Sequence, residues 1–284
     1  MKMVKKILFG LVAVAAVLSL ASCGIKKDDP EGIIKGTAGN YSVNYKNDTD
    51  DEYRAYKPTG FRHAGELVKI TFNETDLSKV GTSKFGLIFG LKETASGSDR
   101  IRDFFIIGLG ANGNYYLSKY TNVVDIQAKN FGAETDATGT NPKEKQYTSG
   151  SQGIATGKPL YTDSQGNLYA YIWYQVWSDG SIHVKIGDIS DTSSNDKVKE
   201  WKDTLDKNKK DHVPAFNADD GEHLYYETTI PAGDTGYSTW TGENDPAPQD
   251  YAAIYARVSK TMTLNGKVNF KADFKEAEDI EPID

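Results

Sequence analysis

The sequence predicts an all-β protein, a single antiparallel β-sandwich with one short amphipathic helix bracing it. Apolar and polar residues alternate with period two in about ten short segments, as in strands with one buried face. Turn-forming Gly, Asn and Asp residues separate these segments, and only one stretch has apolar residues at helical spacing. A chain of 284 residues fits one large β domain or two small ones, and the unbroken series of strands favours one.

The N-terminus has the pattern of an export signal. Lysines at positions 2, 5 and 6 precede an apolar run of about 14 residues, long enough for a secretory signal and too short to span a bilayer. The run ends in Leu20-Ala21-Ser22-Cys23-Gly24, which resembles the lipobox of bacterial lipoproteins. The resemblance implies that residues 1–22 are a signal peptide and that Cys23 is the lipidated residue.

Lipidation would also account for the only cysteine of the chain, and the alternative is an ordinary secretory signal with an incidental cysteine. Several acyl chains anchor a protein stably to a bilayer, so we expect an extracytoplasmic protein held to a bacterial membrane by lipid. Gly24 differs from the aspartate that resembles an inner-membrane retention signal, which favours the outer membrane. Residues 23–40 are polar, with Gly and Pro, and are expected to form a flexible tether.

The predicted sandwich domain covers residues 41–275, and the acidic residues 276–284 are expected to be a solvated tail. Its strands are expected at Leu67–Phe72, Phe85–Leu91, Phe104–Ile107, Tyr115–Tyr120, Val123–Ala128, Leu168–Trp177, Ser181–Gly187, Leu224–Ile230, Ala252–Leu264 and Lys267–Phe274. Asp179-Gly180 and Asn265-Gly266 predict type I′ hairpins between the strands that flank them. The helix is expected around Val198, Trp201 and Leu205.

Part of this pattern is similar to the concanavalin-like lectins and glucanases. Within Phe85–Tyr120 a glycine-containing strand, an apolar strand, a glycine turn and a tyrosine-rich strand follow one another, and Trp177–Val184 resembles a later hairpin of such domains. The resemblance implies a jelly-roll sandwich with a glycan-binding sheet face. Fold alone does not establish function.

Composition and motifs exclude several classes of function. A formal net charge of −7 disfavours nucleic acid as a partner, because phosphates repel acidic surfaces. Gly108–Gly113 matches GxGxxG, but a β-forming segment follows it where a nucleotide fingerprint needs a helix. No P-loop, GxSxG elbow or HExxH helix is present in the sequence. We therefore expect no nucleotide and no cofactor.

The candidate ligand site is the hairpin Leu168–Gly187. Alternation places aromatic side chains on one face of its first strand, where His183 and Lys185 of the second strand join them. Rings interleaved with hydrogen-bonding groups are suited to sugars. The alternative is that this face is covered and its rings belong to the core. The predicted ligand-binding residues are Tyr169, Tyr171, Trp173, Trp177, His183 and Lys185, with Tyr237 and Trp240 from the loop 232–250 as a roof over the groove.

Calcium and catalysis have weaker support. Three acidic turns, at 48–52, 163–167 and 219–222, offer oxygen ligands, but none reproduces an EF-hand loop. The nearest string to a glucanase Glu-x-Asp-x-Glu motif is Glu276–Glu281, which follows the last strand and has the wrong spacing.

We therefore expect a non-catalytic, lipid-anchored β-sandwich that binds glycan. The first rival is an adhesin that binds a protein partner through its long loops at 135–159 and 232–250. The second rival is a glycoside hydrolase or lyase that uses dispersed carboxylates.

Overall fold

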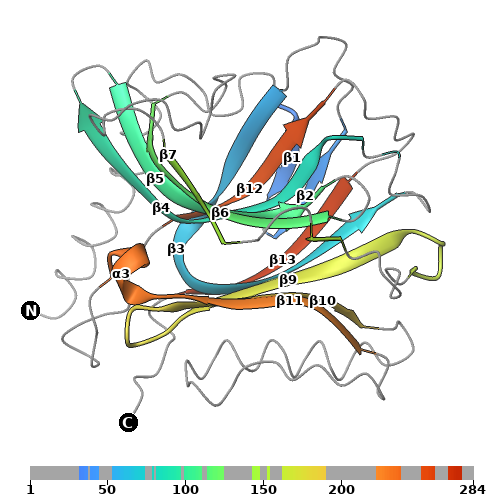
Figure 1. The fold of residues 1–284 in the computed structure, drawn as a ribbon. Helices are drawn as coiled ribbons and strands as arrows, with labels where there is room; N and C mark the ends of the chain where they lie inside the picture. Colours follow the sequence, from blue (N-terminus) through green and yellow to red (C-terminus); the bar gives the residue numbers. More distant parts are fainter. Residues whose placement is uncertain are drawn as a thin grey trace, which may run out of the picture.

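The computed structural model describes residues 32–37, 39–44, 53–73, 79, 81–96, 99–110, 114–124, 143–147, 152–153, 162–189, 222–237, 251–259 and 268–276. These residues form an all-β, sandwich-like fold in which every named strand pair is antiparallel (Figure 1). The predicted fold class is therefore confirmed. Among the described residues, no helix is both long and apolar enough to cross a membrane.

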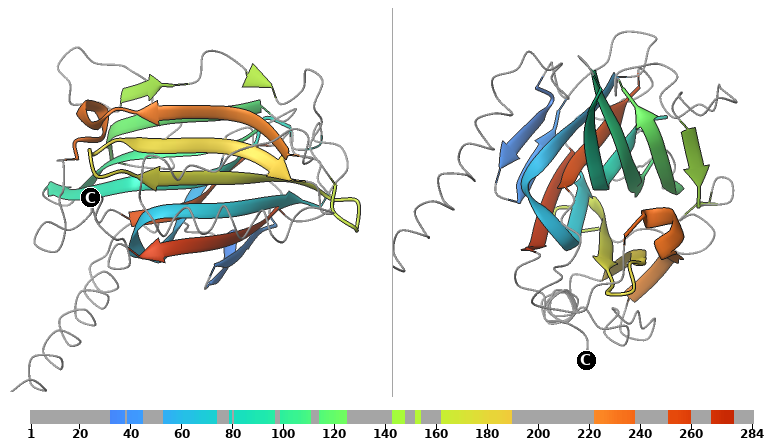
Figure 2. Two further views of the ribbon diagram at one scale, coloured as in Figure 1. Left: turned by 90° about the horizontal axis from the view of Figure 1, so that it is seen from below. Right: turned by 90° about the vertical axis from the view of Figure 1, so that its left-hand side faces the viewer.

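Sheet A contains the candidate hairpin. Its strand order is β1 (Ile34–Thr37), β2 (Asn40–Val43), β13 (Val268–Glu276), the second half of β3 (Tyr53–Phe72), β9 (Leu168–Val176), β10 (Ile182–Ile189) and β11 (Glu222–Ile230). The left view of Figure 2 shows these strands side by side, from orange β11 to blue β1. The hairpin β9–β10 thus lies toward one end of the sheet, with β11 at the edge.

Sheet B runs from the first half of β3 through β12 (Tyr251–Val258), β4 (Lys84–Ser96), β5 (Asp99–Leu109) and β6 (Asn114–Val123). Two short strands, β7 (Lys143–Gln146) and β8 (Gln152–Gly153), both pair with β6. The apolar strands β4 and β5 are central, as their uninterrupted hydrophobic runs predict.

Strand β3 joins the two sheets. Tyr53–Arg62 pairs with β12 in sheet B, whereas His63–Phe72 pairs with β13 and Gly65–Phe72 also pairs with β9 in sheet A. Figure 1 shows this strand curving from one sheet into the other. Strands that pass between sheets form the corners of β-sandwiches.

The main hydrophobic core lies between the facing surfaces of the two sheets. Phe89 of β4 stacks on Tyr174 of β9, with ring centroids 4.6 Å apart, and on Phe105 of β5 at 5.3 Å. The inward residues of β9 and β10 belong to this core and are Leu168, Ala170, Ile172, Tyr174, Val176, Ile182, Val184 and Ile186. We call this side of sheet A its inner face and the opposite side its outer face.

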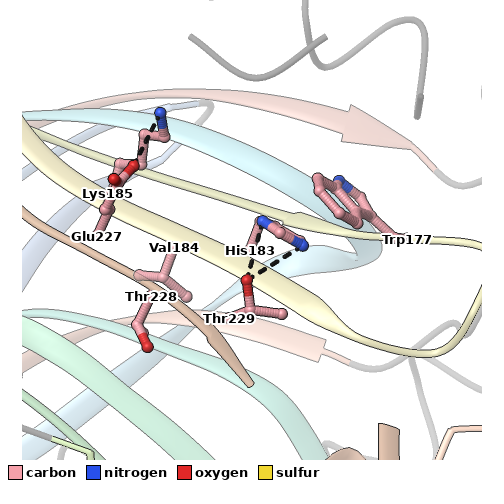
Figure 3. A pocket seen from close by; sticks show the side chains of 7 residues that line it. All are labelled: Trp177, His183, Val184, Lys185, Glu227, Thr228 and Thr229. Atoms are coloured by element: carbon pink, nitrogen blue, oxygen red, sulfur yellow. Dashed lines mark hydrogen bonds and ion pairs between the residues drawn. The ribbon is translucent and has the colours of Figure 1, made fainter. Parts of the chain in front are cut away.

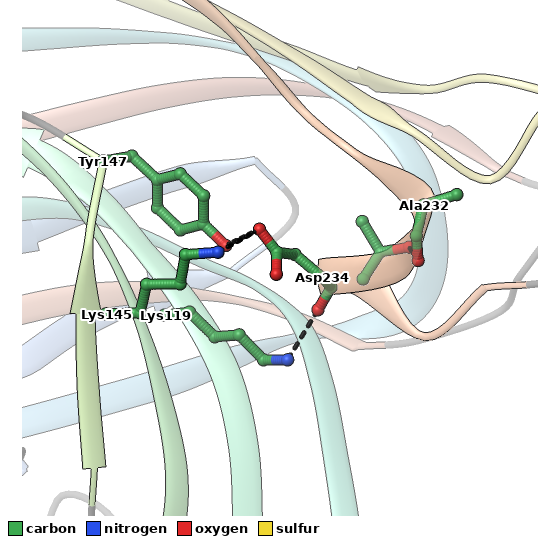
Figure 4. Close-up of polar contacts among 6 residues, drawn as sticks. Lys119, Lys145, Tyr147, Ala232 and Asp234 are labelled. Atoms are coloured by element: carbon green, nitrogen blue, oxygen red, sulfur yellow. Dashed lines mark hydrogen bonds and ion pairs between the residues drawn. The ribbon is translucent and has the colours of Figure 1, made fainter.

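A short helix after β11 makes polar contacts with the far edge of sheet B. This single turn, α3 (Ala232–Thr235), follows β11 directly. The Asp234 carboxylate accepts hydrogen bonds from Lys145 Nζ at 2.5 Å and from the Tyr147 hydroxyl at 3.0 Å, while Lys119 Nζ donates to the Asp234 carbonyl at 2.5 Å (Figure 4). We call these four residues the α3 latch, because they connect the end of sheet A to β6 and β7.

Two expectations about the chain ends need correction. The predicted Asn265-Gly266 hairpin would pair the last two strands, but β12 and β13 both pair with β3 instead and lie on opposite sides of it. Residues Ile34–Thr37, which lie in the range expected to be a tether, form β1 and pair with β2. The predicted helix around Trp201 and the lipobox residue Cys23 lie outside the described residues.

Candidate functional site

The β9–β10 hairpin closes through a different turn from the one predicted. Trp177 N donates to Ser181 O at 2.8 Å, and Gly180 N donates to Trp177 O at 2.9 Å. Of the residues in this loop, only Gly180 has a positive φ, at 81°. A type I′ turn needs two such residues, so the loop is a three-residue hairpin connection that ends in a left-handed glycine.

This turn sets the register that brings the candidate residues together. Val184 lies opposite Tyr174 on the inner face, whereas His183 lies opposite Gln175 and Lys185 lies opposite Trp173 on the outer face. A two-residue turn would shift the pairing by one position and move every side chain of one strand to the other face. The predicted division of the hairpin into an apolar face and an aromatic face is confirmed.

Three of the predicted ligand-binding rings are closed to solvent. Tyr169, Tyr171 and Trp173 are 0%, 6% and 1% exposed, and Gln175 beside them is fully buried. Lys69 Nζ of β3 lies 3.9 Å from the centre of the Tyr169 ring, a cation–π contact. The open aromatic platform expected from the sequence is not formed at these rings, because the outer face is packed there.

An accessible pocket lies farther along the same face, where β10 meets the edge strand β11. Its volume is about 400 Å³, within the usual range of ligand pockets, roughly 300–1,000 Å³. The residues that line it are Trp177, His183, Val184, Lys185, Glu227, Thr228 and Thr229 (Figure 3). Three predicted residues, Trp177, His183 and Lys185, therefore share one pocket.

The aromatic end of the pocket is held by a side-chain stack. The indole of Trp177 and the imidazole of His183 lie nearly parallel, with an interplanar angle of 19°. Trp177 Nε1 donates to Gln175 Oε1 at 3.2 Å, and the ring of His183 shares a hydrogen bond with Thr229 Oγ1, 3.2 Å from Nδ1. These contacts hold both rings in place, so a ligand would meet a pre-organised wall.

The charged end of the pocket is an ion pair between neighbouring strands. Lys185 Nζ lies 3.2 Å from Glu227 Oε2, and the register places the two residues directly opposite each other. The lysine side chain is 11% exposed, whereas the glutamate side chain is 57% exposed. The carboxylate is therefore the charged group that an entering ligand meets first.

The predicted roof residue Tyr237 is not among the described residues that line this pocket. Tyr237 packs against the main core, and Lys92 Nζ lies 4.4 Å from the centre of its ring. The backbone N–H of Tyr237 donates to Thr235 Oγ1, and this hydrogen bond fixes Tyr237 beside α3. Trp240 lies outside the described residues.

The acidic turn at Asp163 caps its own loop. Its carboxylate accepts hydrogen bonds from Gln165 N at 2.9 Å, Asn167 N at 2.8 Å and Asn167 Nδ2 at 3.0 Å. Burial raises the pKa of Asp163, but these hydrogen bonds outweigh that effect and lower it overall. The described residues contain no cluster of three metal-ligating side chains, and the acidic turns at 48–52 and 219–221 lie outside them.

Sequence reasoning missed the contribution of β11. Leu224–Ile230 was expected to be a strand, and period-two spacing puts Glu227 and Thr229 on one face of it. Pairing with β10 was not visible, because 32 residues separate Ile189 from Glu222 and no turn signal links the two strands. Among the described residues that line the pocket, Glu227, Thr228 and Thr229 come from this strand.

No protein-family model and no curated protein matches this sequence. The residues of the pocket are therefore the evidence on which a function has to be argued.

Proposed function

We propose that this protein is a lipid-anchored, extracytoplasmic bacterial lipoprotein whose β-sandwich binds glycan without catalysis, through the pocket between β10 and β11. The observation that carries the binding proposal is the composition of that pocket. One wall is the Trp177–His183 stack, and the other groups are the Thr229 hydroxyl and the Lys185–Glu227 ion pair. An aromatic wall beside donors and acceptors suits a ligand that has C–H faces and hydroxyl groups.

The carboxylates of the pocket favour binding over hydrolysis. Glu227 is the single acidic side chain among the described residues that line it. Glycosidases of the usual kind need two carboxyl groups, about 5–5.5 Å apart for retention and roughly 6.5–9.5 Å for inversion. Glu227 also holds an ion pair with Lys185, a role that favours a fixed structural group.

A glycan-array screen tests the binding proposal. The wild-type domain is expected to bind at least one glycan, and His183→Ala and Thr229→Val are each expected to weaken that binding about tenfold, the cost of one lost hydrogen bond of about 1.4 kcal/mol. Thr71→Val is the matched control, because Thr71 lies on β3 opposite the buried Tyr169 and outside the pocket. Binding that ignores both pocket substitutions would contradict the proposed site.

Mass spectrometry of the native protein tests the anchor independently. We expect the mature chain to begin at Cys23 and to carry acyl chains, and Cys23→Ser is expected to release the protein from the membrane fraction. An unmodified thiol, or a retained leader, would remove the membrane placement. Capture of a protein partner by cross-linking on intact cells, together with no glycan binding, would favour the adhesin.

A further inference from the structure

Among the described residues that line the pocket, one side chain is positive and one is negative. These two, Lys185 and Glu227, form an ion pair, and the other described lining side chains are uncharged when His183 is neutral. An incoming anion would have to share the positive charge of Lys185 with the Glu227 carboxylate, which would bring two negative charges close together. Breaking a partly buried ion pair leaves a charge poorly solvated, which is costly.

The two charges also differ in how they face solvent. The Lys185 side chain is 11% exposed and the Glu227 side chain is 57% exposed, so the rim of the pocket presents a carboxylate. A second carboxylate or a sulfate placed beside it would meet like-charge repulsion, and wrong charges at an interface cost several kcal/mol. The formal net charge of −7 adds a weaker, long-range repulsion of anions.

Uncharged hydroxyl groups fit the same surroundings without that cost. A hydroxyl can donate to the Glu227 carboxylate and accept from the Thr229 hydroxyl, since a hydroxyl is both donor and acceptor. Trp173, the cross-strand neighbour of Lys185, adds no charge there. Each side of the pocket therefore favours neutral polar groups over anionic ones.

We infer that the pocket selects neutral, hydroxyl-rich sugars and rejects glycans that carry carboxylate or sulfate groups. This inference rests on the proposed glycan-binding function and names the ligand class of the same site. The selectivity arises because the Glu227 carboxylate already neutralises the Lys185 ammonium group, with which an acidic sugar would have to pair.

The test is a glycan array that carries neutral, uronate-containing and sulfated versions of the same backbones. We expect every ligand to be neutral, with its uronate counterpart bound at least tenfold more weakly. Glu227→Gln removes the exposed carboxylate that repels anions and leaves the positive charge of Lys185, so the preference for the neutral member should fall at least fivefold or reverse. Glu93→Gln is the control, because it also removes a carboxylate from an ion pair, with Arg102 of sheet B, outside the pocket.

The outcomes separate the inference from the function on which it rests. Equal or tighter binding of acidic glycans by the wild-type protein would overturn the selectivity and leave glycan binding standing. An unchanged preference in Glu227→Gln would overturn the role of the ion pair. A folded protein that binds no glycan on the array would overturn the proposed function itself, and this inference with it.

Discussion

The two ends of the outer face of β9 differ, although one alternating pattern specifies both. At one end Tyr169, Tyr171 and Trp173 are buried in packing. At the other end Trp177, just after β9, is 7% exposed, but it stacks on His183 and lines a pocket. The pattern determines which face a ring occupies, but its neighbours determine whether the ring borders a pocket. Aromatic residues on a strand face therefore do not by themselves indicate a binding platform.

The largest loss of stability is expected from substitution of Trp173, at the buried end of the outer face of β9. Trp173→Ala is expected to lower the free energy of unfolding by about 3–5 kcal/mol, because it leaves a large cavity. Trp173→Phe should cost less than about 1.5 kcal/mol, because it keeps most of the volume and removes an indole N–H that has no hydrogen-bond partner among the described residues. Urea denaturation measures both. A Trp173→Ala variant as stable as the wild type would show that this end is not packed.

The inner face provides a second measure of burial. Glu66 of β3 lies opposite Tyr174 and is fully buried, and neither carboxylate oxygen has a hydrogen-bond partner among the described residues. Burial raises the pKa of Glu66 well above its ordinary value. The folded state therefore favours the protonated carboxyl group. Its contribution is intact below the unfolded-state pKa of about 4.3 and is lost as pH rises toward the folded-state pKa.

Glu66→Gln tests this directly, since glutamine stays neutral at every pH. The variant should gain stability relative to the wild type as pH rises above about 4.5, by at most about 1.4 kcal/mol per pH unit. Denaturant unfolding from pH 4 to pH 8 measures the difference. A difference that does not vary with pH would mean that the carboxyl group is not held in its neutral form.

The turn between the two strands should give an intermediate effect. Gly180 has φ +81°, and a Cβ there would lie 2.7 Å from the Tyr237 carbonyl oxygen. Gly180→Ala is expected to cost about 1–3 kcal/mol and to weaken binding at the pocket, because this turn sets the register of β10. Gly233→Ala is the matched control, with no atom within 4 Å of its added Cβ. Equal thermal stability of the two variants would contradict this role.

The smallest effect should come from the α3 latch. The Lys145 hydrogen bond is the main cause of the lowered pKa of Asp234, with Tyr147 adding to it. The contribution of this carboxylate is fully present above its unfolded-state pKa of about 3.9 and is lost as pH falls through its lower folded-state pKa. Asp234→Asn should cost less than about 1 kcal/mol at pH 7, cost less as pH falls below about 3.9, and leave the proposed glycan binding unchanged. Loss of ligand binding in this variant would contradict this prediction and would show that the α3 latch supports the pocket.

The alternation of apolar and polar residues predicted much of the fold. The pairings between strands that are distant in the sequence could not be predicted in this way. The ranges of β9 and β10 and the division of their faces follow from alternation, whereas the type I′ turn predicted at Asp179-Gly180 would have shifted their register by one residue. The predicted β12–β13 hairpin is wrong, because β3 is long enough to take one partner in each sheet. The site was found in part: His183 and Lys185 were named, while Glu227 and Thr229 depend on a pairing that only the folded chain shows.

The strand shared by both sheets affects when the chain can fold. Val258 pairs with Tyr53, and Val268 pairs with Phe72, so β3 has to wait for partners that lie about 200 residues later. Neither sheet can be completed before β12 and β13 have been synthesised. Such long-range pairing predicts slow folding, because the pairs that join β3 to β12 and β13 form last.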